Sequence, residues 1–157
     1  MMRRLAVSVF PLLFAMIAVP ASAQDREVPY WATLRSEEVN MRVGPSEAFP
    51  IEWVYQREGL PVKVIRLREG WRLVEDPDGA RGWIVARLLN PKRGAIVVGK
   101  GVAEIRASAD GEAKLLWKVE PGNVGSLGDC DSGWCRMDIG GHKGWIREDR
   151  LWGDGEP

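Results

Sequence analysis

The sequence predicts an all-β protein in which two copies of one small β-barrel follow an N-terminal export signal. Three observations support this prediction: an apolar leader, a set of Gly-Trp pairs that recurs at fixed spacing, and short β-branched runs separated by turn residues. They divide the 157 residues into a leader (1–23), an N-terminal extension (24–33), a first barrel (34–93), a second barrel (94–152) and a tail (153–157).

The leader has the three segments of a secretory signal peptide. Arg3 and Arg4 supply a positive start, the run from Leu5 to Val19 is predominantly apolar, and an Ala-Ser-Ala sequence ends at Ala23. The apolar run is shorter than the roughly 20 residues that a membrane-spanning helix needs. We therefore expect cleavage after Ala23 and a mature protein in the periplasm or outside the cell. A leader retained as a membrane anchor is the alternative.

The composition of the mature chain argues against nucleic-acid binding and against a membrane-spanning segment. Without the two leader arginines, 20 basic residues face 22 acidic ones, so the formal charge is −2. A protein that binds nucleic acid through phosphate contacts needs a basic surface, and this composition does not indicate one. No later segment is long and apolar enough to cross a bilayer. We expect neither a nucleic-acid partner nor a membrane span in the mature protein.

An internal repeat is the main signal of organisation. Gly59, Gly70-Trp71 and Gly82-Trp83-Ile84 match Gly122, Gly133-Trp134 and Gly144-Trp145-Ile146. In both copies the first glycine precedes the first tryptophan by 12 positions, and the second tryptophan follows 12 or 11 positions later. Upstream, Val39–Arg42 matches Val102–Arg106 with one residue inserted.

Each copy has about 60 residues, which is near the lower limit for burying a core. We therefore expect the recurring tryptophans to belong to the structural core, since each indole can bury a large area. They are Trp71, Trp83, Trp134 and Trp145. The connection 90–94 is short, so we also expect the two barrels to pack against each other.

Within a copy, the local pattern is one of short strands and turns. Pro61–Ile65 and Trp71–Val74 are rich in β-branched residues, and Asp76-Pro77-Asp78-Gly79 follows them. Pro77 presets φ for a turn and Gly79 tolerates positive φ. No window of the mature chain holds a clean helical stripe, and short strands at this spacing indicate a barrel or a sandwich.

The opening of the first copy resembles a known family. Val39–Ser46 (VNMRVGPS) resembles the start of bacterial SH3 (SH3b) domains, in which an N-x-R-x-G-P stretch leads into a long loop. The later order of turn glycine, strand tryptophan and closing Gly-Trp is similar too, while the second copy lacks the Asn and the Gly-Pro. The resemblance implies two tandem SH3-like barrels. It implies a non-catalytic module that recognises peptidoglycan or wall peptides, or alternatively a structural or assembly protein that binds an envelope protein.

Cys130 and Cys135 are the only cysteines, and four residues separate them. In an oxidising compartment such a pair across a tight turn indicates a disulfide. The alternative is a catalytic pair of one cysteine with His142, which requires a free thiolate in an electropositive site. One histidine and two paired cysteines do not make a conventional zinc site. We expect a disulfide, no metal, no cofactor and no enzymatic activity.

Candidate binding residues are the aromatic side chains that do not recur at the repeat positions, because SH3 barrels hold extended peptides in aromatic grooves. These candidates are Tyr30, Trp31, Trp53, Tyr55 and Trp152. Trp53 lies near the register of Trp117, so core packing is its alternative role, and Tyr30-Trp31 could instead clasp the barrel. Arg42 is a candidate for a charge-assisted contact to a peptide carboxylate, or for a salt bridge to a nearby acid.

Overall fold

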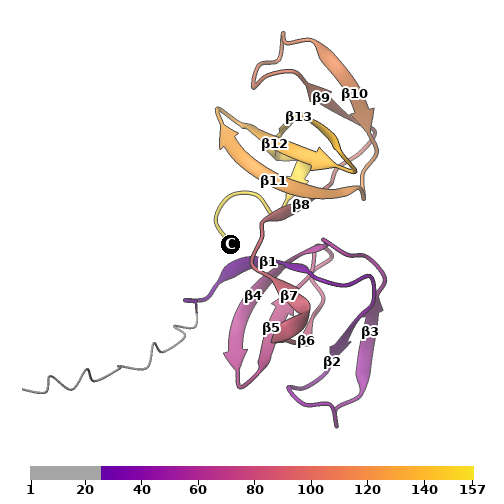
Figure 1. Cartoon of the computed structure of the whole chain (residues 1–157), viewed down its shortest axis with the longest axis vertical. Helices are drawn as coiled ribbons and strands as arrows, with labels where there is room; N and C mark the ends of the chain where they lie inside the picture. Colours follow the sequence, from indigo (N-terminus) through magenta and orange to yellow (C-terminus); the bar gives the residue numbers. More distant parts are fainter. Residues whose placement is uncertain (1–25) are drawn as a thin grey trace, which may run out of the picture.

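The computed structural model describes residues 26–157, so the predicted signal peptide and its cleavage after Ala23 lie outside the described residues. Two seven-stranded antiparallel sheets coil into two small barrels, which are stacked along the long axis of the molecule (Figure 1). The prediction of an all-β fold with two tandem SH3-like barrels is confirmed. Within residues 26–157, the helical segments are two short 3-10 turns, and no helix has the length and hydropathy to span a membrane.

The strands of the two barrels correspond one to one. The first barrel contains β1 (Tyr30–Leu34), β2 (Val39–Arg42), β3 (Ile51–Tyr55), β4 (Pro61–Arg68), β5 (Trp71–Glu75), β6 (Arg81–Val85), η1 (Ala86–Leu88) and β7 (Leu89–Asn90). The second contains β8 (Gly94–Val97), β9 (Ala103–Arg106), β10 (Leu115–Val119), β11 (Val124–Asp131), β12 (Trp134–Ile139), β13 (His142–Arg147), η2 (Glu148–Arg150) and β14 (Leu151–Trp152). The sheet orders are β3-β2-β6-β5-β4-β1-β7 and β10-β9-β13-β12-β11-β8-β14. Since β1 begins at Tyr30, part of the expected N-terminal extension belongs to the first sheet.

The strand register corrects one detail of the predicted repeat. Arg42 pairs with Trp83, and Arg106 pairs with Trp145. Val39–Arg42 therefore aligns with Ala103–Arg106 without a gap, and the predicted inserted residue is wrong. The match of Val39 to Val102 followed residue type, whereas the fold conserves burial: Val39 and Ala103 are buried, and Val102 is exposed.

The core of each barrel is built mainly from small and medium-sized hydrophobic side chains. The first contains Ala32, Leu34, Val39, Met41, Tyr55, Leu60, Val62, Val64, Val74, Ile84 and Leu89, and the second Ala95, Val97, Ala103, Ile105, Val119, Cys135, Met137, Ile146 and Leu151. None of the four recurring tryptophans belongs to these clusters. Trp134 is nevertheless one of the buried hydrophobic residues, at 7% exposed, in agreement with its predicted role, while Trp71, Trp83 and Trp145 are half-buried. Successive side chains of a strand point to opposite faces, so where Ile84 and Ile146 point inward their tryptophan neighbours point outward.

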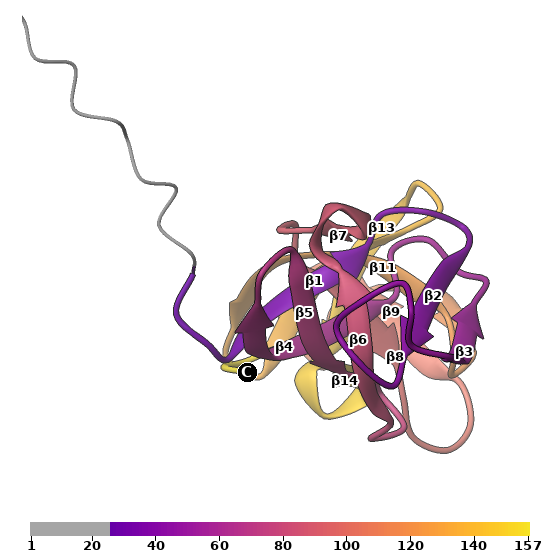
Figure 2. The same ribbon diagram turned by 90° about the horizontal axis from the view of Figure 1, so that it is seen from below.

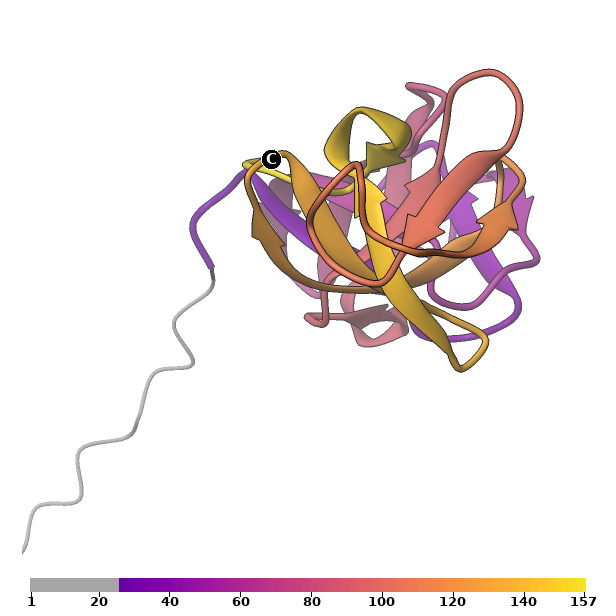
Figure 3. The ribbon, with the colours of Figure 1, turned by 90° about the horizontal axis from the view of Figure 1, so that it is seen from above.

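The barrels pack directly against each other, as expected from the short connection. Ile96 and Val124 of the second barrel pack against the first core. A Cβ on Gly94 would lie 2.7 Å from Thr33 Cγ2 and 3.2 Å from the carbonyl oxygens of Gly59 and Gly125, so this position tolerates little more than glycine. Views along the axis that joins the barrels show one barrel behind the other (Figure 2, Figure 3).

The C-terminal residues join this contact. The chain ends beside the junction of the barrels (Figure 1). The indole N–H of Trp31 donates to the Gly155 carbonyl at 3.2 Å, and the Trp31 and Trp152 rings meet edge to face at 4.8 Å. Arg93 donates to the carbonyls of Gly153 and Gly155. The predicted tail therefore fastens the second barrel to the first.

Candidate functional site

The cysteine pair has a structural role. Cys130 and Cys135 face each other across the β11–β12 hairpin and form the predicted disulfide. Cys135 is fully buried. His142 lies elsewhere, with its ring 5.5 Å from that of Trp117, so the catalytic Cys–His alternative has no geometric basis. Glu148 approaches both sulfurs, but sulfurs joined in a disulfide are not thiolate ligands for a metal.

Arg42 forms a hydrogen bond with the backbone of the β2–β3 loop. Its guanidinium donates to the Phe49 carbonyl at 2.7 Å, and Arg106 donates to the Ala113 carbonyl at the same distance. In each copy the acceptor lies seven residues after the arginine. Because this contact recurs where the second copy has lost the Asn and Gly-Pro, it belongs to the fold of the β2–β3 loop. Within residues 26–157 no salt bridge to Arg42 is found, so the structure does not support the salt-bridge alternative, while the contact with a peptide carboxylate stays a prediction.

Tyr30 and Trp31 are half-buried on β1. Arg72 lies 3.3 Å from the Tyr30 hydroxyl through its Nε, and Trp31 makes the junction contacts described above. The structure therefore favours the clasp over a free binding surface for this pair. Trp152 is its partner in the clasp.

Tyr55 is a buried strut. Its side chain is 6% exposed, and its hydroxyl donates to Asp76 Oδ2 at 2.8 Å. Burial, followed by the hydrogen bond to Asp76, raises the pKa of the Tyr55 hydroxyl above its usual value. Asp76 also accepts from the backbone N–H groups of Asp78 and Ala80, at 3.0 and 2.8 Å. Tyr55 thus positions the turn after β5 and is not an exposed binding residue.

Trp53 has the opposite environment from its counterpart. Trp53 pairs with Met41 and Trp117 with Ile105, so the two indoles occupy equivalent positions. Trp117 is half-buried against the second core and beside His142, whereas Trp53 is 59% exposed. The core alternative for Trp53 is therefore wrong.

Four other exposed apolar side chains lie on β3 or in the loop before it. We call this set the β3 surface: Val43, Phe49, Ile51, Trp53 and Val54, each at least 41% exposed. It covers the edge strand of the first sheet and the loop before it. Of these residues, the sequence interpretation identified Trp53 alone. The sequence signal for Phe49, Ile51 and Val54 was the hydrophobic content of 49–54, which remains exposed because β3 is an edge strand.

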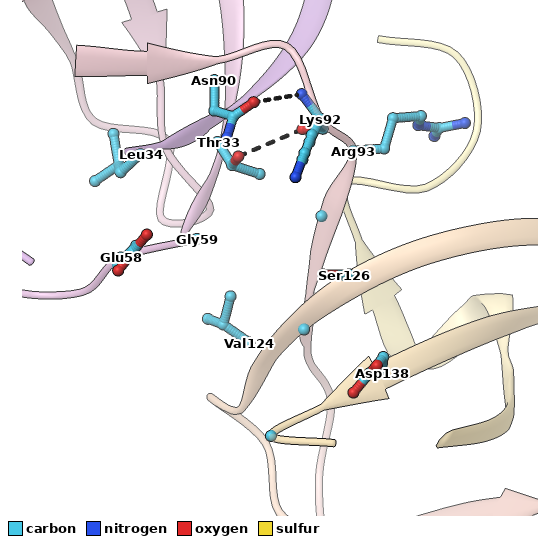
Figure 4. A pocket seen from close by; sticks show the side chains of 13 residues that line it. Thr33, Leu34, Glu58, Gly59, Asn90, Lys92, Arg93, Val124, Ser126 and Asp138 are labelled. Carbon is cyan, nitrogen blue, oxygen red and sulfur yellow. Dashed lines mark hydrogen bonds between the residues drawn. The ribbon is translucent and has the colours of Figure 1, made fainter. Parts of the chain in front are cut away.

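Two clefts lie at the junction of the barrels. The first has a volume of about 340 Å³ and is lined by residues of both barrels, among them Glu58, Lys92, Arg93 and Asp138 (Figure 4). Several of its polar groups have partners within the protein. Arg93 donates to the C-terminal segment, and Asp138 accepts from the Gly141 N–H and pairs with Lys143. This cleft offers few free groups to a ligand.

The second cleft, which we call the Trp53 cleft, has a volume of about 400 Å³. Trp53 and the Asp76-Pro77-Asp78 turn line it from the first barrel, and Ile96–Gly99 with Pro121-Gly122 line it from the second. The buried side chains of Tyr55 and Leu60 complete it. It combines an exposed indole, apolar walls and carboxylates, and none of its lining residues is basic.

Comparisons with known proteins agree with this architecture. The model of the bacterial SH3 domain matches residues 35–91 and 99–153, one match for each barrel. A curated relative, "Putative N-acetylmuramoyl-L-alanine amidase YrvJ" of Bacillus subtilis (strain 168), is 20% identical over 156 residues, covering 93% of this chain and 30% of that protein. The chain thus spans less than a third of the length of that relative.

Solved structures give more distant matches. NlpC2 from Trichomonas vaginalis is 16% identical with a TM-score of 0.36, over 82% of this chain and 49% of that one. An NlpC/P60 family protein from Bacillus cereus ATCC 10987 is 14% identical with a TM-score of 0.36, over 78% and 56%. With one family match on each barrel and the same strand order in both, the chain belongs to the bacterial SH3 domain family and carries two tandem copies of the domain.

Proposed function

We propose that the mature chain is a non-catalytic binding module of the cell envelope that recognises peptidoglycan through its peptide segments. The observation that carries this proposal is the β3 surface, a group of exposed apolar side chains on an edge strand. An edge strand presents unpaired backbone N–H and C=O groups, which an extended peptide can pair with. Its side chains then rest on the neighbouring apolar groups.

Two further points support the proposal. The predicted signal peptide would direct the chain out of the cytoplasm. Wall peptides are accessible only outside the cytoplasm. The curated relative is named for the bond between N-acetylmuramic acid and L-alanine, which is the attachment point of a wall peptide. The match covers 93% of this chain and 30% of that relative, and no activity is carried over from it.

Sedimentation with purified sacculi tests the proposal. The mature chain 24–157 should co-sediment at low salt, and Trp53→Ala should weaken binding by at least about tenfold, as expected for an aromatic anchor. Leu116→Ala is the matched control, because Leu116 is 44% exposed on the corresponding edge strand of the second barrel. Wild-type protein that stays in the supernatant contradicts the proposal.

A second candidate function is an assembly protein that docks on another envelope protein. It is favoured by the second edge strand, β10, where Leu115 and Leu116 are also exposed. A partner of sufficient size could contact both edges at once. Cross-linking in envelope extract separates the two functions: capture of one protein that depends on Leu115 and Leu116 favours assembly, and sacculus binding that depends on Trp53 favours wall recognition.

A further inference from the structure

The residues that line the Trp53 cleft include the carboxylates Asp76 and Asp78 and no basic side chain. Asp76 is 7% exposed, and its three hydrogen-bond donors are all neutral: the Tyr55 hydroxyl and two backbone N–H groups. In the described part of the chain no basic side chain forms a salt bridge with Asp76 or Asp78. Two arginines reach the rim: Arg57 donates to the Gly122 carbonyl and Arg150 to the Val98 carbonyl, so both guanidinium groups are engaged by backbone oxygens.

The carboxylates act on one region. Asp76, Asp78 and Glu52 each contribute electrostatically to the raised pKa of Tyr55, after burial and the Asp76 hydrogen bond. Their fields therefore add near the hydroxyl of Tyr55, and Tyr55 is one of the residues that line the cleft. Apolar walls keep the local dielectric low, and a cleft of one charge sign with such walls concentrates ions of the opposite sign.

The second barrel shows that the fold does not require these groups. Val119 occupies the position of Tyr55, and Ile139 that of Asp76, in strands of the same order and register. At the position of Trp53, the second barrel has Trp117 packed beside His142. A barrel of this type is therefore complete with apolar residues at the two strut positions. The buried carboxylate and the open indole are specific to the cleft.

We propose that the Trp53 cleft binds a primary ammonium group carried on a peptide, with the cation on the indole face of Trp53 and paired with the carboxylate of Asp78. An indole face attracts a cation through its quadrupole, and a carboxylate forms a charge-assisted hydrogen bond with it. The buried carboxylate of Asp76, which also lines the cleft, adds its negative charge to the attraction of the ammonium group. The inference rests on the proposed function for the source of the peptide, and it adds that wall peptides with a free side-chain amine are the ligands.

Sacculi with free amines and sacculi whose amines have been acetylated give the direct test. Acetylation should weaken wild-type binding by about tenfold, the loss expected for a hydrogen bond between charged groups. Asp78→Asn should bind weakly and no longer distinguish the two preparations. Its exposed turn position and retained backbone N–H to Asp76 favour normal folding. Asp129→Asn, an exposed carboxylate of β11, is the control for net charge and should behave as wild type.

The outcomes separate this inference from the function on which it rests. Equal binding of wild type to both preparations leaves wall recognition intact and overturns the ammonium site. Equal sensitivity of Asp78→Asn and wild type to acetylation places the amine elsewhere and also overturns it. If sacculi are not bound at all, calorimetric titration with the tripeptide Ala-Glu-Lys and its Nε-acetylated form decides: Asp78-dependent binding of the free amine supports the site, and no binding overturns it.

Discussion

The hydrogen bond between Tyr55 and Asp76 offers a quantitative test of the structure. Tyr55→Phe removes one hydroxyl from a side chain that is 6% exposed and leaves Asp76 with its two backbone donors. A hydrogen bond to a charged group contributes about 1.5–3 kcal/mol, so the free energy of unfolding should fall by about 2 kcal/mol. Tyr30→Phe is the matched control. Tyr30 is half-buried and its hydroxyl contact with Arg72 is 3.3 Å, so that change should cost less than about 1 kcal/mol.

Urea unfolding at pH 7 measures the difference. With a typical slope of about 2 kcal/mol/M, a loss of 2 kcal/mol moves the midpoint by about 1 M. A double-mutant cycle with Asp76→Asn isolates the pair, and the coupling energy should be about 2 kcal/mol. If Tyr55→Phe and Tyr30→Phe have equal effects, or if the cycle gives no coupling, the assigned hydrogen bond is wrong.

The pH dependence of the same variant gives an independent check. Burial and the bond to Asp76 raise the pKa of Tyr55, so above about pH 10 the unfolded chain releases a proton that the folded chain retains. The free energy of unfolding of the wild type therefore falls as the pH rises above this point, and Tyr55→Phe lacks that contribution. The difference in stability between the two proteins should shrink between pH 9 and pH 11. A difference that stays constant over this range contradicts the raised pKa.

Three further predictions concern stability. Cys130→Ser should lower the free energy of unfolding by about 2 kcal/mol, because that is the chain-entropy value for so short a loop. Wild-type protein with reductant should have the same melting temperature as the variant. An unchanged melting temperature argues against a stabilising Cys130–Cys135 bridge. Gly94→Ala should cost about 1–3 kcal/mol by overpacking the junction and should split thermal unfolding into separate transitions for the barrels, and one unshifted transition rules out the tight contact. The hydrogen bond from Arg81 is the main reason that the pKa of Glu75 is lowered. Glu75→Gln should therefore reduce the free energy of unfolding by under about 1 kcal/mol at pH 7, and this difference from wild type should disappear as the pH falls through the lowered pKa. A difference in stability that persists at pH 2 is inconsistent with the ion pair.

Local patterns predicted much of the architecture correctly. Glycines at turn positions carry positive φ in both copies, as Gly59 and Gly122 do, and such positions are visible in a sequence because few other residues tolerate them. The disulfide was predictable for a similar reason, since its two cysteines are close in the chain and share one hairpin. The placement of the tryptophans in the two Gly-Trp-Ile sequences could also have been predicted. Neighbouring residues of a strand point to opposite faces, so only one of the two large side chains can point inward. The buried one is isoleucine in both copies.

The features that distinguish the two barrels were beyond local reasoning. Trp53 and Trp117 are equivalent in register, yet their exposure differs. Part of the difference lies in the residue that the next hairpin supplies: His142 packs beside Trp117, and its counterpart by strand register is Ala80. Tyr55 and Asp76 are 21 positions apart, and the sequence predicted a binding aromatic residue at the first position and a turn residue at the second. Their pairing depends on how two hairpins of one barrel fold onto each other.

The sequence by itself determined the class of fold, the repeat and the covalent link, because these depend on spacing along the chain and on intrinsic backbone preferences. The tertiary structure alone decided which aromatic groups are open to a ligand, that the last residues clasp the first strand, and that a cleft forms between the barrels. Exposure is a property of neighbours in space, and in a protein of two packed barrels many of those neighbours come from distant parts of the chain.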